Sequence, residues 1–497
     1  MARRLIRSCR STHRIRCVIY RWFPCNYNLF FMNSFNHTLA ATQEKAFEIN
    51  LDKGLYGSFA EIGAGQETAN WFFRSSGAAG TVAKTISAYD MTVSDALYGQ
   101  ARRYVSEERL KQMMEYEYNQ LINRLGEKRG KDTCFFAFCN TVKCKGYRDN
   151  GPWSAWIGVR FQLRPELPPS DFVMHVRLIV PDHDVQMRIL GILGVNLLYS
   201  LFYKRDRMEQ FVQSVGDNLD RAFYEIDFMR FSGHGFGMFD NRLLAVELIR
   251  SGLSEATLIC PDGSVAQPAD YLYKRPIVLM RGSFRPLCNI HLEMMDSVRA
   301  KFLESLPEEQ RERVVDICEL SLANLLRGEN VDLLECLDRI EALAAEGKMV
   351  MVTKKARFHR LSTLLSQYTK EPVAIALSIG LLNEIFKDKW SDTPGGILAT
   401  VGHIFVNSTK FYVTPWINRT TGEFVTAGTY KAPEKYHFLY QHLRENGYIV
   451  EVPYFNQKLL FQTPRDIVRM IKAGDEQWKE YVPESAVRLV EHIKEEA

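Results

Sequence analysis

The residues of this chain best suited to chemistry lie between positions 276 and 295, in the stretch PIVLMRGSFRPLCNIHLEMM. The first part, residues 276–280, is a short apolar run that is typical of a buried strand. Gly282 and Pro286 then interrupt the chain, and helical spacing begins near Ile290. A helix that starts just after a strand presents free backbone N–H groups, which bind anions such as phosphate.

Side chains suited to phosphate binding accompany this turn, and we call residues 281–291 the central turn. Its arginines offer forked positive charges that match phosphate oxygens. His291 donates hydrogen bonds and carries charge near neutral pH. The predicted anion-binding residues are Arg281, Gly282, Ser283 and Arg285.

Residues 282–292, GSFRPLCNIHL, resemble the signature of the nucleotidylyltransferase superfamily, and most closely that of nicotinate/nicotinamide mononucleotide adenylyltransferases. That signature reads G-S-F-x-P-x-H-x-G-H and lies at a strand-to-helix turn of a Rossmann-like domain. The resemblance implies that Gly282, Ser283 and Phe284 contact the triphosphate of ATP. It also implies that His291 is the catalytic residue, in contact with the phosphate under attack, and that Mg²⁺ accompanies the ATP. Cys288 and Ile290 replace the first histidine and the close-approach glycine of the signature.

These two departures leave three functional hypotheses open. The first is an adenylyltransferase that joins a nucleotide monophosphate, such as nicotinate mononucleotide, to ATP and releases pyrophosphate by positioning its substrates and stabilising charge. The second is a protein that binds a nucleotide or phosphometabolite without turnover. The third is a structural or interaction protein. Cys288 and Ile290 favour the second and third hypotheses, whereas the arginines favour the first and second.

Three shorter stretches, RGSFRP, YTKEP and GDEQW with a following VPE, resemble a large bacterial family to which no activity is assigned. Some members of that family carry the adenylyltransferase label, which rests on the same short signature. This second resemblance therefore adds no function beyond the one that the central turn already implies.

A second glycine-rich turn, GHGFG at residues 233–237, separates a predicted strand from a predicted helix. Glycines at such a turn let the backbone approach a phosphate closely. Gly233, Gly235 and Gly237 are therefore further candidate binding residues, with an arginine of the central turn as their partner from a neighbouring strand end. The alternative is a loop that needs glycine only for tight turns.

The elements that must position these residues alternate between strand and helix from residue 225 onward. Strands are predicted at residues 225–231, 256–261, 276–280, 349–353, 372–377 and 411–415. This alternation predicts an α/β fold with a Rossmann-like, doubly wound sheet in the C-terminal half, where ligands bind beyond the carboxyl ends of the strands. Residues 309–346 are predicted to form two amphipathic helices that break at Gly328.

The N-terminal half predicts an α+β region. Residues 134–180 contain three β-rich segments separated by Gly and Pro turns, which indicate an antiparallel sheet. The apolar run at 189–203 contains two glycines and an asparagine, so it is interpreted as a buried helix rather than a membrane span. The predicted organisation is an N-terminal extension at 1–31, a mainly helical, small-residue-rich region at 32–130, a β-rich region with a helix at 131–220, the Rossmann-like domain at 221–417 and an α-rich lobe at 418–497.

The formal net charge of +4 originates at the N-terminus, because residues 1–31 hold seven arginines and no acidic residue, which leaves −3 for the rest. A nearly neutral body argues against nucleic-acid binding. Ten cysteines without a C-x-x-C pair indicate free thiols in a reducing compartment. We therefore predict a cytoplasmic protein that binds a small molecule and no membrane. Residues 1–31 are interpreted as a misassigned start before Met32 or as a targeting segment outside the folded core.

Overall fold

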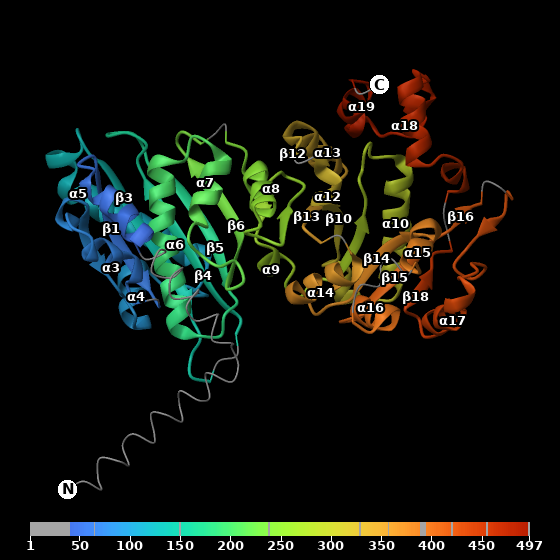
Figure 1. Cartoon of the computed structure of the whole chain (residues 1–497), viewed down its shortest axis with the longest axis horizontal. Coiled ribbons are helices and arrows are strands. Elements are labelled where there is room, and N and C mark those ends of the chain that lie inside the picture. Colours follow the sequence, from blue (N-terminus) through green and yellow to red (C-terminus); the bar gives the residue numbers. More distant parts are fainter. Residues whose placement is uncertain are drawn as a thin grey trace, which may run out of the picture. The chain divides into compact units, whose positions relative to one another are not determined.

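The computed structural model describes residues 40–63, 65–148, 151–236, 239–327, 330–355, 357–387, 394–418, 421–453 and 456–495. The predictions for residues 1–31 and for Gly237 lie outside these ranges. The chain divides into two compact units near Tyr224, with Met174–Val176 assigned to the second unit and Ser232–Phe236 to the first. The predicted α/β class is confirmed, since helices and largely parallel sheets alternate along the chain (Figure 1).

The first of the two large sheets has six strands in the order β2-β1-β3-β4-β5-β6, with β1 parallel to β2 and β3, and β3 antiparallel to β4. Its strands are β1 (Leu55–Ile62), β2 (Val82–Ile86), β3 (Cys134–Lys143), β4 (Trp153–Phe161), β5 (Ser170–Leu178) and β6 (Tyr224–Gly233). A helix at residues 40–51 precedes β1. The other described α-helices before β6 are α3 (Glu67–Arg74), α4 (Met91–Tyr98), α5 (Glu107–Arg129), α6 (His183–Tyr203) and α7 (Met208–Val215).

A glycine in β1 serves the packing of neighbouring strands. A Cβ atom on Gly57 would lie 2.3 Å from the ring of Phe136 on the neighbouring strand. Glycine therefore lets β1 pair closely with β3, and its low strand propensity conceals the strand from sequence patterns. The region 32–130 therefore contains the strands β1 and β2 beside its helices.

Helix α6 is long and apolar enough to cross a membrane by length and composition. However, 72% of its most apolar window is buried inside the protein, as is common for a core helix. Its first residues are capped by Asp182, whose side chain accepts a hydrogen bond from the N–H of Val185 at 3.0 Å. This placement agrees with the interpretation of the run as a buried helix.

The second large sheet has eight strands in the order β18-β15-β14-β9-β10-β13-β7-β8. The six strands from β18 to β13 are parallel, and β7 and β8 extend the β13 edge in antiparallel orientation. Its strands are β7 (Ala256–Ile259), β8 (Val265–Ala266), β9 (Ile277–Arg281), β10 (Val315–Ser321), β13 (Met349–Thr353), β14 (Val373–Ser378), β15 (Thr409–Thr414) and β18 (Ile449–Glu451). Two short hairpins pair β11 (Leu326–Arg327) with β12 (Asn330–Val331) and β16 (Trp416–Ile417) with β17 (Phe424–Val425).

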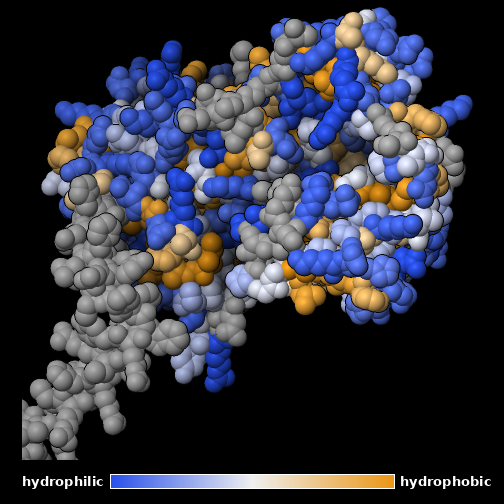
Figure 2. All heavy atoms as spheres, turned by 45° about the vertical axis from the view of Figure 1, so that its right-hand side comes forward, coloured by the Kyte–Doolittle hydropathy of each residue, from blue (hydrophilic) through white to orange (hydrophobic). Residues whose placement is uncertain are grey.

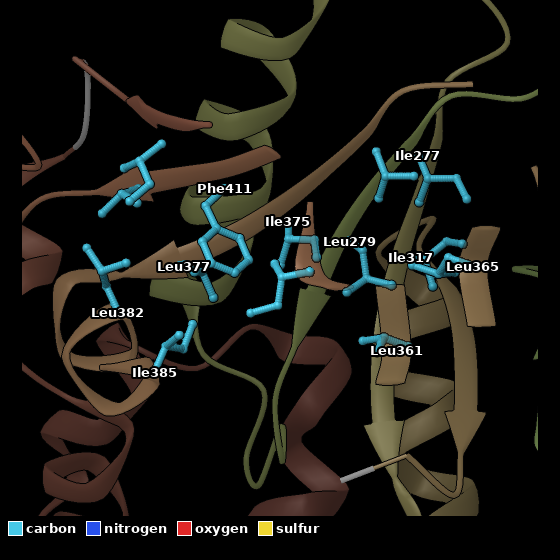
Figure 3. Packing of buried hydrophobic residues seen from close by; sticks show 14 of the residues in the cluster. Ile277, Leu279, Ile317, Leu361, Leu365, Ile375, Leu377, Leu382, Ile385 and Phe411 are labelled. Atoms are coloured by element: carbon cyan, nitrogen blue, oxygen red, sulfur yellow. The ribbon is translucent and has the colours of Figure 1, made fainter. Parts of the chain in front are cut away.

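Helices cover both faces of this sheet, as in doubly wound folds. The helices are α8 (Asn241–Ser251), α9 (Pro268–Tyr271), α10 (Asn289–Glu304), α11 (Glu308–Arg311), α12 (Leu322–Leu325), α13 (Leu333–Ala345), α14 (Phe358–Tyr368), α15 (Ile379–Ile385), α16 (Gly396–Ile404), α17 (His437–Glu445), α18 (Pro464–Ala473) and α19 (Val487–Glu495). Alternate strand residues such as Leu279, Ile317 and Ile375 belong to one core cluster with Leu361 of α14 and Leu382 of α15 (Figure 3). Helix α10 contacts β9, β14 and β15, and α13 contacts β13.

Three elements differ from the sequence expectation for this half. The helix predicted at the start of 309–346 is instead β10, a central strand between β9 and β13. A buried parallel strand is apolar on both faces, so its pattern resembles that of a buried helix. Strand β6 belongs to the six-stranded sheet, and β18, from the segment assigned to a separate lobe, completes the eight-stranded one.

The face of the molecule drawn in Figure 2 is mostly hydrophilic, with hydrophobic patches separated by polar residues. Individual large apolar side chains are exposed, for example Phe438 at 81% and Leu398 at 68%. Scattered exposed apolar residues are normal on protein surfaces, so they identify no partner by themselves.

Candidate functional site

The strand order of the eight-stranded sheet indicates where a ligand site is expected. Counted along the chain, the six parallel strands β9, β10, β13, β14, β15 and β18 are arranged in the order 3-2-1-4-5-6. The chain moves outward from β9 through β10 to β13, then returns to place β14 on the other side of β9. The loops after β9 and β14 therefore diverge at the carboxyl edge, which opens a crevice where open α/β sheets bind ligands.

A cavity of about 610 Å³ lies at this place. Its size is within the range of about 300–1,000 Å³ that small-molecule sites occupy. The residues that follow the strands supply most of its lining. These residues are Arg281, Gly282, Ser283, Ser321, Ala323, Asn324, Arg357, Phe358, His359, Leu381, Glu384, Ile385, Thr400, Ile404 and Arg465.

The cavity combines an apolar wall with polar groups that have no protein partner. Helices α14, α15 and α16 contribute apolar side chains, whereas the ends of β9 and β10 contribute hydroxyl and amide groups. The side chains of Ser283, Ser321, Asn324 and Arg465 make no hydrogen bond or ion pair with any residue that the structure describes. Polar groups that line a cavity without protein partners are available to a polar ligand.

The arginine that opens the central turn is held by a buried carboxylate. Arg281 donates to both carboxylate oxygens of Glu319 on β10, at 2.5 and 3.0 Å, and to the carbonyl of Lys355 at 2.7 Å. Glu319 is fully buried and also accepts from the hydroxyl of Thr353 at 2.5 Å. Arg281 lines the cavity, but its guanidinium neutralises Glu319, so it offers a ligand little net charge.

The second arginine of the central turn is held in the same way. Arg285 donates through Nε to Glu335 of α13 at 2.6 Å. Arg339, one helical turn later, donates to the same carboxylate and also to the carbonyls of Ser283 and Asn324, at 3.2 and 2.8 Å. Burial lowers the pKa of Arg339 to about 10. These bonds hold the backbone of the central turn in place, and the side chain of Ser283 lines the cavity.

Gly282 is required by the aromatic ring two residues later. A Cβ atom at Gly282 would lie 2.9 Å from the ring of Phe284, which is fully buried and has a φ of 47°. The ring also packs edge-on against His291, with 5.3 Å between centroids. The Gly-Ser-Phe sequence therefore makes a compact turn whose phenylalanine lies inside the protein.

His291 caps helix α10. The helix begins at Asn289, one residue before the expected start near Ile290, and Cys288 is its cap residue. The Nδ1 atom of His291 accepts a hydrogen bond from the N–H of Cys288 at 3.0 Å. Removal from water lowers the pKa of His291 to about 4, so the ring is neutral near pH 7. A neutral ring that accepts from the backbone performs the capping-box function. His291 is not among the residues that line the cavity.

The structure thus brings some of the predicted site residues together and separates others. Arg281, Gly282 and Ser283 line the cavity, whereas Phe284, Arg285 and His291 form the support beneath the turn. Gly233 and Gly235 have φ angles of 96° and 90°, as tight turns require. Gly233 ends β6 and Gly235 follows it, and β6 belongs to the six-stranded sheet. The expectation that this turn and the central turn lie at neighbouring strand ends is therefore wrong. Gly237 lies outside the described residues.

Several lining residues carried a signal that went unused. Ser321 ends β10 and Asn324 follows it, so their position beside β9 depends on this segment being a strand. Polar residues at 321 and 324, at the end of an apolar strand, are the signal that identifies them. Arg465 lies in the second half of the C-terminal segment, and no local pattern connects it with residues 180 positions earlier.

Comparisons with known proteins assign no family to this chain. No protein-family model matches it, and no curated protein is similar to it in sequence. A competence/damage-inducible protein from Agrobacterium tumefaciens is 17% identical, with a TM-score of 0.24 over 32% of this chain and 94% of that one. A competence-damaged superfamily protein from Klebsiella pneumoniae is 14% identical, with a TM-score of 0.25 over 32% of this chain and 97% of that one. Likeness at this level assigns no activity.

Proposed function

We propose that the cavity beside β9 binds a nucleotide or another phosphorylated metabolite, and that binding is not followed by adenylyl transfer. The observation that carries this proposal is the coincidence of the cavity with the point where the strand order reverses. Unpartnered hydroxyl, amide and guanidinium groups suit phosphate and ribose oxygens. The apolar side chains of α14, α15 and α16 suit the face of a base.

The interactions that hold the central turn in place argue against the transferase hypothesis. Adenylyl transfer depends on groups that stabilise charge on the phosphate under attack. His291, the candidate for that role, is neutral and already accepts a backbone hydrogen bond. Arg281 and Arg285 are paired with buried carboxylates. These side chains are therefore committed to the fold.

The lining also suits metal-free binding better than a protein-held Mg²⁺ site. Mg²⁺ prefers carboxylate and water oxygens in octahedral geometry. Among the described lining residues the carboxylate is Glu384, which forms an ion pair with Lys387. A magnesium ion would have to arrive on the phosphates of its ligand.

Isothermal titration and thermal shift with ATP, AMP, NAD, nicotinate mononucleotide and sugar phosphates test the proposal. A ligand that binds only the folded state raises the melting temperature. Asn324→Asp places a carboxylate in the cavity and should weaken binding of the best ligand by at least ~10-fold, the scale of a charged interaction. Asn407→Asp makes the same change just before β15, at the opposite edge of the sheet, and should leave binding unchanged. Absence of binding by every phosphorylated compound would refute the proposal.

Pyrophosphate release from ATP with nicotinate or nicotinamide mononucleotide tests the alternative. We expect no release above the rate without protein. Release by the wild type that disappears in His291→Ala, while the variant remains folded, would restore the adenylyltransferase hypothesis. Equal release in both proteins would point to a contaminating enzyme.

A further inference from the structure

The charged side chains that line the cavity have protein partners, except at one described position. The carboxylates of Glu319 and Glu335 neutralise arginines of the central turn, and Glu384 is paired with Lys387. Arg465 is different, because it lines the cavity without a hydrogen bond or ion pair to any residue within the described ranges.

The helix that carries Arg465 explains why this side chain has no partner. Arg465 occupies the first turn of α18, where Asp466 is the nearest acidic residue. Asp466 completes a capping box with Thr463, accepting from its N–H at 2.8 Å and from its hydroxyl at 2.5 Å. Asp466 also contacts Arg469 at 3.4 Å. The local acid is therefore used by the cap and by another arginine, and Arg465 is exposed at the cavity.

We infer that Arg465 is the residue that selects for a phosphate monoester on the bound ligand, an inference that rests on the proposed function. Its guanidinium presents several N–H donors in one plane, which matches the oxygens of a phosphate dianion. The hydroxyls of Ser283 and Ser321 and the amide of Asn324 line the same cavity and are neutral, so they do not discriminate between charged and uncharged ligands. The C-terminal segment thereby completes a site built mostly by the loops after β9, β10 and β14.

Titration of the full chain with two matched pairs of probes tests this inference. The pairs are AMP with adenosine, and nicotinamide mononucleotide with its riboside. For at least one pair, the wild type should bind the phosphorylated member ~10-fold or more tightly than the dephosphorylated one. Arg465→Ala should remove this preference, and Arg465→Lys, which keeps the charge but loses the fork, should retain part of it.

Arg469→Ala is the matched control, because Arg469 lies one turn later on α18 and its side chain is 77% exposed. It should keep the full preference, and all three variants should melt within a few degrees of the wild type, since exposed substitutions change stability little. A preference that survives Arg465→Ala, or that Arg469→Ala removes equally, would overturn the inference. If the screen selects another phosphorylated ligand, that ligand and its dephosphorylated form replace the two pairs. Equal binding of both members of every pair overturns the inference alone, whereas binding of no phosphorylated compound overturns the proposed function as well.

Discussion

Both units place parallel strands beside a helix N-terminus, yet they treat the anion-binding position in opposite ways. In the first unit, Glu61 near the end of β1 accepts hydrogen bonds from the N–H groups of Thr68 and Ala69 in α3, at 3.1 and 3.0 Å, and from Asn140 at 2.9 Å. Burial raises the pKa of this carboxyl group. The protein therefore fills the position with its own side chain.

In the second unit, the corresponding edge is left open. Helix α14 has Arg357 at its cap and no side-chain cap bond, and its first residues line the cavity with Ser283 and Ser321. Buried carboxylates are present here too, but Glu319 and Glu335 lie under the turn and hold arginines. The comparison shows that a strand end beside a helix indicates a ligand only when the protein has not already supplied the anion.

The largest expected effect comes from breaking the ion pairs that hold the central turn in the second unit. Glu335→Ala removes a buried carboxylate that serves both Arg285 and Arg339, so the free energy of unfolding should fall by about 3–5 kcal/mol. Urea denaturation followed by circular dichroism measures this loss. Glu341→Ala, on the same helix, removes a partly exposed partner of Arg242 and Arg488 and should cost about 0–1 kcal/mol. Similar losses in both variants would show that the ion pairs under the turn have no special role.

A somewhat smaller effect is expected from removing the carboxylate at the end of β1 in the first unit. Glu61→Ala leaves two helix N–H groups and the Asn140 amide without their acceptor in a buried place, which should cost about 2–4 kcal/mol. Glu61→Gln keeps an acceptor oxygen and should cost less. Glu67→Ala, in the first turn of α3, is the control and should change stability by less than about 0.5 kcal/mol. Unfolding of Glu61→Ala at the urea concentration of the wild type would contradict the comparison.

The smallest effect concerns the cap of α10. His291→Ala removes the capping acceptor and should cost about 1–2 kcal/mol. The pKa of His291 is about 4 in the folded protein and about 6.5 in the unfolded chain, so the unfolded state binds the proton more readily. The contribution of the neutral ring is fully present above pH 6.5 and is lost as the pH falls toward 4.

Stability measured at several pH values distinguishes this role from a catalytic one. Wild type should lose about 1–3 kcal/mol more than His291→Gln between pH 6.5 and pH 4, because glutamine accepts the same bond without titrating. Parallel pH profiles for the two proteins would show that protonation of His291 does not affect folding, and its capping role would then be rejected.

The sequence alone determined the local units of this protein. The strand β9, the turn at Gly282 and the helix α10 follow from short-range patterns, since an apolar run, glycine with proline, and helical spacing act within a few residues. The alternation of strands and helices was likewise enough for the α/β class, and it pointed to the carboxyl edge as the place for a ligand.

Only the tertiary structure decided which side chains face that edge. Arg281 meets Glu319 across 38 positions of sequence, and Arg285 meets Glu335 across 50, so no local pattern could show that these arginines are neutralised. Strand β10 looked like a helix because both of its faces are buried between helices. Arg465 reaches the cavity from the far end of the chain, because the packing of elements around the sheet, rather than sequence distance, sets which groups meet.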